Sequence, residues 1–110
     1  MNPALTTAIQ KAADTLTAAA MDASHAGANV RAQTPRRLWE ADSFLEWMDY
    51  ADQVSAALYH RERCVADDDN ADRIVAEAKI LEARNSLLTA RAALASVADL
   101  AIRCVVESGQ

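Results

Sequence analysis

The chain has 110 residues, 52% of them hydrophobic and 25% charged, and a formal net charge of −5. This length fits one domain with one modest core. Because charges of both signs are mixed along the chain, binding to nucleic acid or to an anionic membrane through charge alone is disfavoured. Charged residues interrupt every long apolar stretch, so no membrane span is expected. Lys11 and Asp14 also break up the N-terminal stretch, which therefore does not resemble a secretory signal, and a cytoplasmic location is expected.

The composition favours helices throughout. Only two glycines and two prolines are present, whereas alanine, leucine, arginine and glutamate are abundant. No run alternates between apolar and polar residues as a half-buried strand would. The sequence predicts a single all-α domain over residues 1–110, with helices at approximately 3–26, 35–66 and 70–106.

The first predicted helix is bounded by residues typical of helix ends. Asn2 and Pro3 suit an N-cap followed by a first helical residue. The run that follows is weakly amphipathic and rich in alanine. Gly27 is expected to end this helix, because glycine tolerates the left-handed conformation that commonly closes a helix.

The second predicted helix carries the strongest apolar pattern in the chain. Thr34 and Pro35 are expected to open it, while Ser43 and Glu46 form a capping-box pattern that is also consistent with a fresh start near Asp42. An apolar stripe with helical spacing follows and predicts core residues. It contains Phe44, Trp47, Ala51, Val54, Leu58 and Val65.

An acidic turn is predicted to separate the second helix from the third. The segment 67–70 reads Asp-Asp-Asp-Asn, and its acids suit the N-terminus of the next helix through capping and dipole attraction. A calcium loop is disfavoured because the interleaved ligands, glycine and distal glutamate of an EF-hand are missing. The two helices should therefore form a long antiparallel hairpin.

The third predicted helix has an unusually broad apolar face. Two columns repeat every seven residues: Ile80, Leu87, Leu94 and Ala101 lie beside Leu81, Leu88, Ala95 and Ile102. The helix would be roughly 50 Å long, whereas a compact chain of this size is only about 35 Å across. A kink near 85–86, the first helix lying along the pair, or dimerisation through the sevenfold stripe would resolve the mismatch. We favour the second and third together, so the predicted fold is three-helix bundle-like, with dimerisation left open.

Two arginines fall within this apolar face. Arg84 and Arg91 are seven residues apart on the third predicted helix. For a hairpin that turns near residue 69, they should face the neighbourhoods of Asp49–Asp52 and Glu46. Charge pairs at these positions would help to set the register of the hairpin.

No motif points to catalysis, a cofactor or a metal. Cys64 and Cys104 should lie far apart in the hairpin and stay unlinked. His60 and Cys64 have the spacing of half a zinc site, but the other half is missing. Phosphate-binding glycine loops, a serine elbow and an HExxH helix are also absent from the sequence. The sequence therefore predicts a protein that is not an enzyme.

The second helix carries an additional apolar patch. This patch consists of Leu38, Leu45, Met48 and Tyr59. It cannot face the same neighbouring helix as the main stripe, so a different element must pack against it. Either the first helix or another protein would be that element. Arg36 and Arg37 oppose the helix dipole in the first predicted turn, and such a conflict often marks function. The predicted partner-binding residues are Arg36, Arg37, Leu38, Trp39, Leu45 and Met48.

These features predict a small, non-enzymatic, protein-binding regulator or inhibitor that acts through a helical surface. Aromatic and methionine side chains are favoured in the buried centres of protein interfaces. The size and composition are typical of bacterial and phage accessory proteins that block larger proteins, an association by analogy. The alternative is a self-associating structural or scaffold protein that uses the sevenfold stripe.

Overall fold

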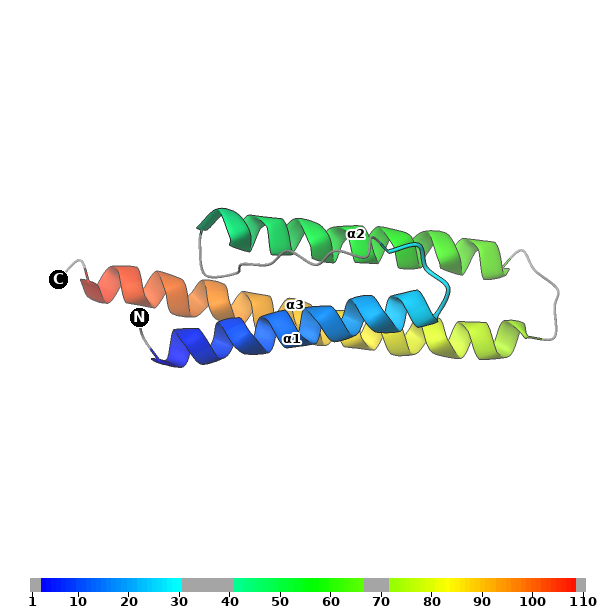
Figure 1. Cartoon of the computed structure of the whole chain (residues 1–110), viewed down its shortest axis with the longest axis horizontal. Helices are drawn as coiled ribbons and strands as arrows, with labels where there is room; N and C mark the ends of the chain where they lie inside the picture. The colour runs from blue at the N-terminus through cyan, green and yellow to red at the C-terminus, as the bar shows by residue number, and fades with distance from the viewer. Residues whose placement is uncertain (1–2, 31–40, 67–71, 109–110) are drawn as a thin grey trace.

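The computed structural model describes residues 3–30, 41–66 and 72–108. It contains three helices: α1 (Pro3–His25), α2 (Ala41–Ala66) and α3 (Arg73–Ser108). α2 and α3 form a long antiparallel hairpin, and α1 lies along it (Figure 1). No strand occurs within these ranges. The predicted all-α, three-helix bundle-like fold is confirmed.

Gly27 ends α1 through a Schellman motif, as the sequence predicts. The Ala28 N–H donates to the Ala23 carbonyl and the Gly27 N–H to the Ser24 carbonyl, both at 3.0 Å. These bonds satisfy two carbonyls that the helix end leaves open. Gly27 has a φ of 90°, in the left-handed region. A Cβ built there would also lie 2.7 Å from Nε of Arg61, so both conformation and space favour glycine.

The other helix boundaries agree with the predicted ones to within a few residues. α2 ends at Ala66 as expected, while the predicted start over 35–40 and the acidic turn over 67–70 lie outside the described residues. α3 begins at Arg73 rather than at 70. The Ala76 N–H donates to the Asp72 carbonyl at 2.9 Å, so Asp72 occupies the N-cap position of α3.

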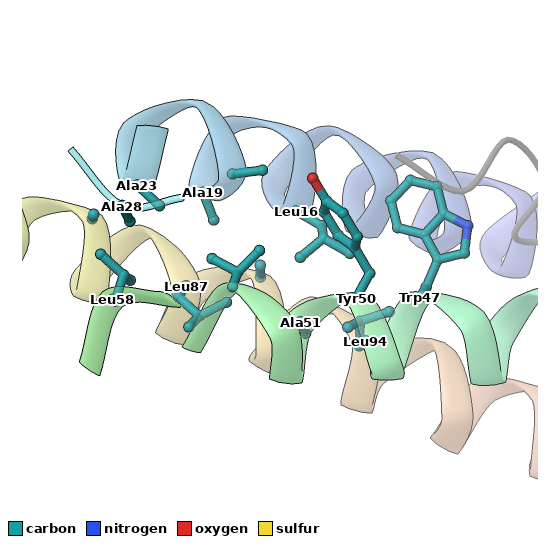
Figure 2. Packing of buried hydrophobic residues seen from close by; sticks show 14 of the residues in the cluster. Leu16, Ala19, Ala23, Ala28, Trp47, Tyr50, Ala51, Leu58, Leu87 and Leu94 are labelled. Atoms are coloured by element: carbon teal, nitrogen blue, oxygen red, sulfur yellow. The ribbon is translucent and has the colours of Figure 1, made fainter. Parts of the chain in front are cut away.

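The core is formed where α1 packs chiefly against α3 and less extensively against α2. Small side chains line the α1 face, which allows the helix axes to approach closely. The buried residues of this face are the alanines Ala12, Ala19, Ala20 and Ala23, with Leu16 as its one large side chain. Figure 2 shows Leu16 directed toward the hairpin, with Tyr50 and Trp47 of α2 on one side of it. Burial raises the pKa of Tyr50 above its ordinary value of 10.0.

Two polar contacts tie α1 to the hairpin. The Ser86 hydroxyl on α3 donates to a carboxylate oxygen of Asp22 at 2.6 Å. On α2, Nε of Arg61 donates to the Ala26 carbonyl at 3.1 Å. Asp22 lies in the last turn of α1 and Ala26 directly follows the helix, so these contacts fix the position of α1 along the hairpin.

The length of α3 is accommodated by an elongated molecule. α3 is one helix of 36 residues, and the molecule measures 61 × 19 × 16 Å. α1 lies along the pair, and the C-terminal end of α3 extends past the first turns of both α1 and α2 (Figure 1). A break near 85–86 is therefore not needed to resolve the predicted mismatch.

We expect Gly27→Ala to destabilise the protein by about 1–2 kcal/mol, because alanine must adopt the left-handed conformation. Urea unfolding followed by circular dichroism would measure the change. The same substitution in an Arg61→Ala background separates backbone strain from the close approach of the arginine. A Gly27→Ala protein as stable as the parent in both backgrounds would contradict the assigned helix end.

Candidate functional site

The main apolar stripe of α2 forms the core, as predicted. Trp47, Val54 and Leu58 are buried, as are Ala51 and Val65, while Phe44 is partly buried against them. The indole Nε1 of Trp47 is buried and finds no hydrogen-bond acceptor among the described residues. These side chains hold the helices together.

The second apolar patch of α2 is exposed in the part that the structure describes. Leu45 is 65%, Met48 46% and Tyr59 58% exposed, so α1 does not cover them. The Arg63 guanidinium lies 5.8 Å from the ring centroid of Tyr59. Of the six predicted partner-binding residues, Leu45 and Met48 are therefore at the surface. The other four, within 36–39, lie outside the described residues.

An apolar groove runs between α2 and α3 beside this patch. Two adjoining hollows form it and share Arg91. The first is lined by Phe44, Met48, Ala51, Asp52, Leu94, Ala95 and Ala98, and the second by Ser55, Leu58, Tyr59, Arg84, Leu87 and Leu88. We call this surface the α2–α3 groove. The sequence placed Met48 and Tyr59 in the second apolar patch but assigned Phe44, Ala51 and Leu58 to the core stripe, so it did not predict the groove.

Two ion pairs cross the groove. Nη2 of Arg91 lies 2.9 Å from Oδ1 of Asp52, whereas the predicted register places Arg91 near Glu46. Arg84 pairs with Glu62, so the expectation that it faces Asp49–Asp52 is wrong. In a helix the side chains lean toward the N-terminus, and in an antiparallel pair long side chains therefore lean toward each other. The α2 partner of each arginine is therefore closer to the hairpin end than the α2 residue directly opposite that arginine along the backbone.

The broad apolar face of α3 divides into a buried and an exposed column. Ile80, Leu87 and Leu94 are buried against α1 and α2. The neighbouring column is exposed, with Leu81 59% and Leu88 65% accessible to solvent. Further exposed apolar side chains lie toward the two ends of α3: Ile74, Val75, Ile102, Val105 and Val106. The sevenfold spacing predicted both columns, but it did not distinguish the covered column from the uncovered one.

The cysteines are not joined in a disulfide, as predicted. Cys64 lies near the hairpin end of α2, whereas Cys104 lies 31 residues into α3, about 46 Å along that helix. The Sγ of Cys64 is 3.9 Å from Nε2 of His60. Within the described ranges, no three histidine, cysteine, aspartate or glutamate side chains cluster as metal ligands would.

The described architecture is a three-helix bundle in which one side of the hairpin carries α1 and the α2–α3 groove is uncovered by any described element. None of its described helices combines the length and apolar character needed to cross a membrane. No protein-family model, curated protein or solved structure matches the chain.

A double-mutant cycle should show that Arg91 and Asp52 are coupled. Both side chains are substantially exposed, so we expect Arg91→Ala and Asp52→Ala to give a coupling energy of about 0.2–1 kcal/mol in urea unfolding. Arg84→Ala with Asp52→Ala is the matched control and should be additive, because Arg84 pairs with Glu62. Coupling in the control cycle alone would contradict the observed pairing.

Proposed function

We propose that this protein is a small, non-enzymatic regulator or inhibitor that binds an amphipathic helix of another protein in the α2–α3 groove. The observation that carries this proposal is the exposure of Met48 and Tyr59 along one wall of an apolar groove, with the exposed Leu45 outside it on the same helix. Exposed contiguous apolar surface is typical of interaction sites on small proteins. A groove between two helices is suited to a third helix, whose apolar residues would recur every three or four positions.

The dimensions and charge of the groove support a helical occupant. Its α2 wall extends from Phe44 to Tyr59, about 22 Å along the helix, which matches roughly four turns of a partner helix. The arginines of the groove are paired with Asp52 and Glu62, so its charges are already balanced. The apolar face of a partner helix would therefore not be packed against an unpaired charge from any of these four side chains. Arg36 and Arg37 remain predicted contacts for acidic groups of the same partner.

Affinity capture with matched variants would test the proposal. We expect the wild-type chain to retain a specific protein from a bacterial lysate, and Met48→Glu to lose it because a charge would enter the groove. Leu81→Glu adds the same charge on an exposed position that lines neither hollow, and should keep the partner. Equal retention by all three chains would contradict a groove-centred interaction.

Trp39→Ala would test the predicted aromatic anchor. Once the captured protein is identified, calorimetry should show affinity weakened by at least about 1 kcal/mol, because truncating a central anchor of an interface typically has this effect. Helical content and thermal stability should stay nearly unchanged. Loss of folding would instead assign Trp39 to the core, and unchanged affinity and stability would remove it from the binding site.

A further inference from the structure

The outer face of α3 carries a regular apolar seam along almost its whole length. Its ten residues are spaced alternately by four and three positions, and every one of them is exposed. They are Ile74, Ala78, Leu81, Asn85, Leu88, Ala92, Ala95, Asp99, Ile102 and Val106. This alternation is the spacing with which one helix packs against another in a coiled coil. We call these residues the outer seam.

We propose that a second copy of this chain packs against the outer seam, with the two α3 helices antiparallel. The surface is distinct from the proposed helix-binding groove, although Leu88 and Ala95 border both. The seam consists of two columns that differ in size. One column has large apolar side chains except at Ala95: Ile74, Leu81, Leu88, Ala95 and Ile102. The other has small or polar side chains except at Val106: Ala78, Asn85, Ala92, Asp99 and Val106. A helix with such columns needs a partner whose large residues lie opposite its small ones.

An antiparallel second copy provides this match. In the register that places Leu88 opposite Ala92 of the second copy, Ile102 lies opposite Ala78 and every outer-seam residue has a counterpart. In these two pairs a large side chain lies beside an alanine, which fills space without overlap. Asn85 faces Ala95 near the middle, and a polar residue in a seam is a common means of fixing register.

The same register covers the ends of α3. Ile74 and Val75 are 79% and 56% exposed near its start, while Val105 and Val106 are exposed near its C-terminal end. Antiparallel pairing places Ile74 opposite Val106 and Val75 opposite Val105. The exposed apolar residues at the start of one α3 therefore cover those at the C-terminal end of the other α3.

Charge disfavours the parallel arrangement. Asp99 is exposed and belongs to the seam. In a parallel, in-register pair it would face its own copy, and directly opposed like charges are destabilising. In the antiparallel pair Asp99 faces Leu81, and the two aspartates are separated by about 27 Å along the helices.

The available contact area is sufficient for a dimer. From Ile74 to Val106 the seam is about 48 Å long, and a helix is about 10 Å wide. Two such strips correspond to about 1,000 Å² of contact, the lower range for a specific interface. This value predicts a reversible dimer rather than an obligate one.

Light scattering and sedimentation of the full chain would test the dimer. We expect a concentration-dependent mass that approaches twice the chain mass of 11.9 kDa. Leu81→Glu should raise the dissociation constant by about 100-fold, because each interface would bury two unpaired charges. Leu45→Glu is the matched control, an exposed leucine on α2 outside the seam, and should dimerise like the parent.

Circular dichroism should show unchanged helicity in both variants, since both leucines are exposed in the monomer. A wild-type chain that stays monomeric at millimolar concentration would overturn the proposal, as would a dimer insensitive to Leu81→Glu. Either outcome leaves the groove proposal intact, because that proposal depends on Met48 and not on Leu81.

Cross-linking would test the orientation. With Cys64→Ser and Cys104→Ser as background, Ile74→Cys and Val106→Cys chains are prepared separately and then mixed. A short thiol cross-linker should join the two different chains and should join neither variant to itself. Cross-links within either single variant would indicate a parallel pair, and a dimer without mixed cross-links would overturn the assigned register.

Discussion

α3 has a broad apolar face, and α1 and α2 together cover only part of it. The hairpin buries Ile80, Leu87 and Leu94, while Leu81 and Leu88, one position further along, remain exposed. A single short helix cannot enclose a two-helix layer from both faces, because each helix contact covers only a limited arc. The elongated shape, the open groove and the uncovered seam all follow from this constraint.

Alanine residues determine which helix α1 packs against. The α1 face and the opposing α3 positions Ala83, Ala90 and Ala93 are small, so these two helices approach closely and form the most extensive contact. The remaining boundary, between α2 and α3, carries the Arg91–Asp52 and Arg84–Glu62 pairs in addition to apolar side chains. Charged side chains keep that boundary in contact with solvent, and a groove remains beside them.

The groove and the outer seam have different physical properties and suit different partners. The groove is short, concave and crossed by ion pairs, which favours a separate helix that fits between α2 and α3. The seam is long, convex and complementary to itself when reversed, which favours a second copy. Leu88 and Ala95 belong to both surfaces, so a second copy on the seam would lie along the edge of the groove.

Local signals were sufficient to predict the helices, because helix ends and apolar periodicity depend on neighbouring residues. Gly27 ended α1 as its conformational freedom predicts, and the stripe through Trp47 and Leu58 proved to be core. The exposed positions of Leu45 and Met48 agree with their separation from that stripe. Residues 36–39, the remainder of the predicted site, lie outside what the structure describes.

The sequence could not show which of Leu87 and Leu88 is buried. Both belong to columns that repeat every seven residues, and they differ only in the side of the helix from which they project. Only the tertiary structure decided it, since a periodic pattern shows that a helix has a covered side but not on which side its neighbour lies. The partner of Arg84 was decided in the same way, by how far two long side chains on different helices lean toward each other.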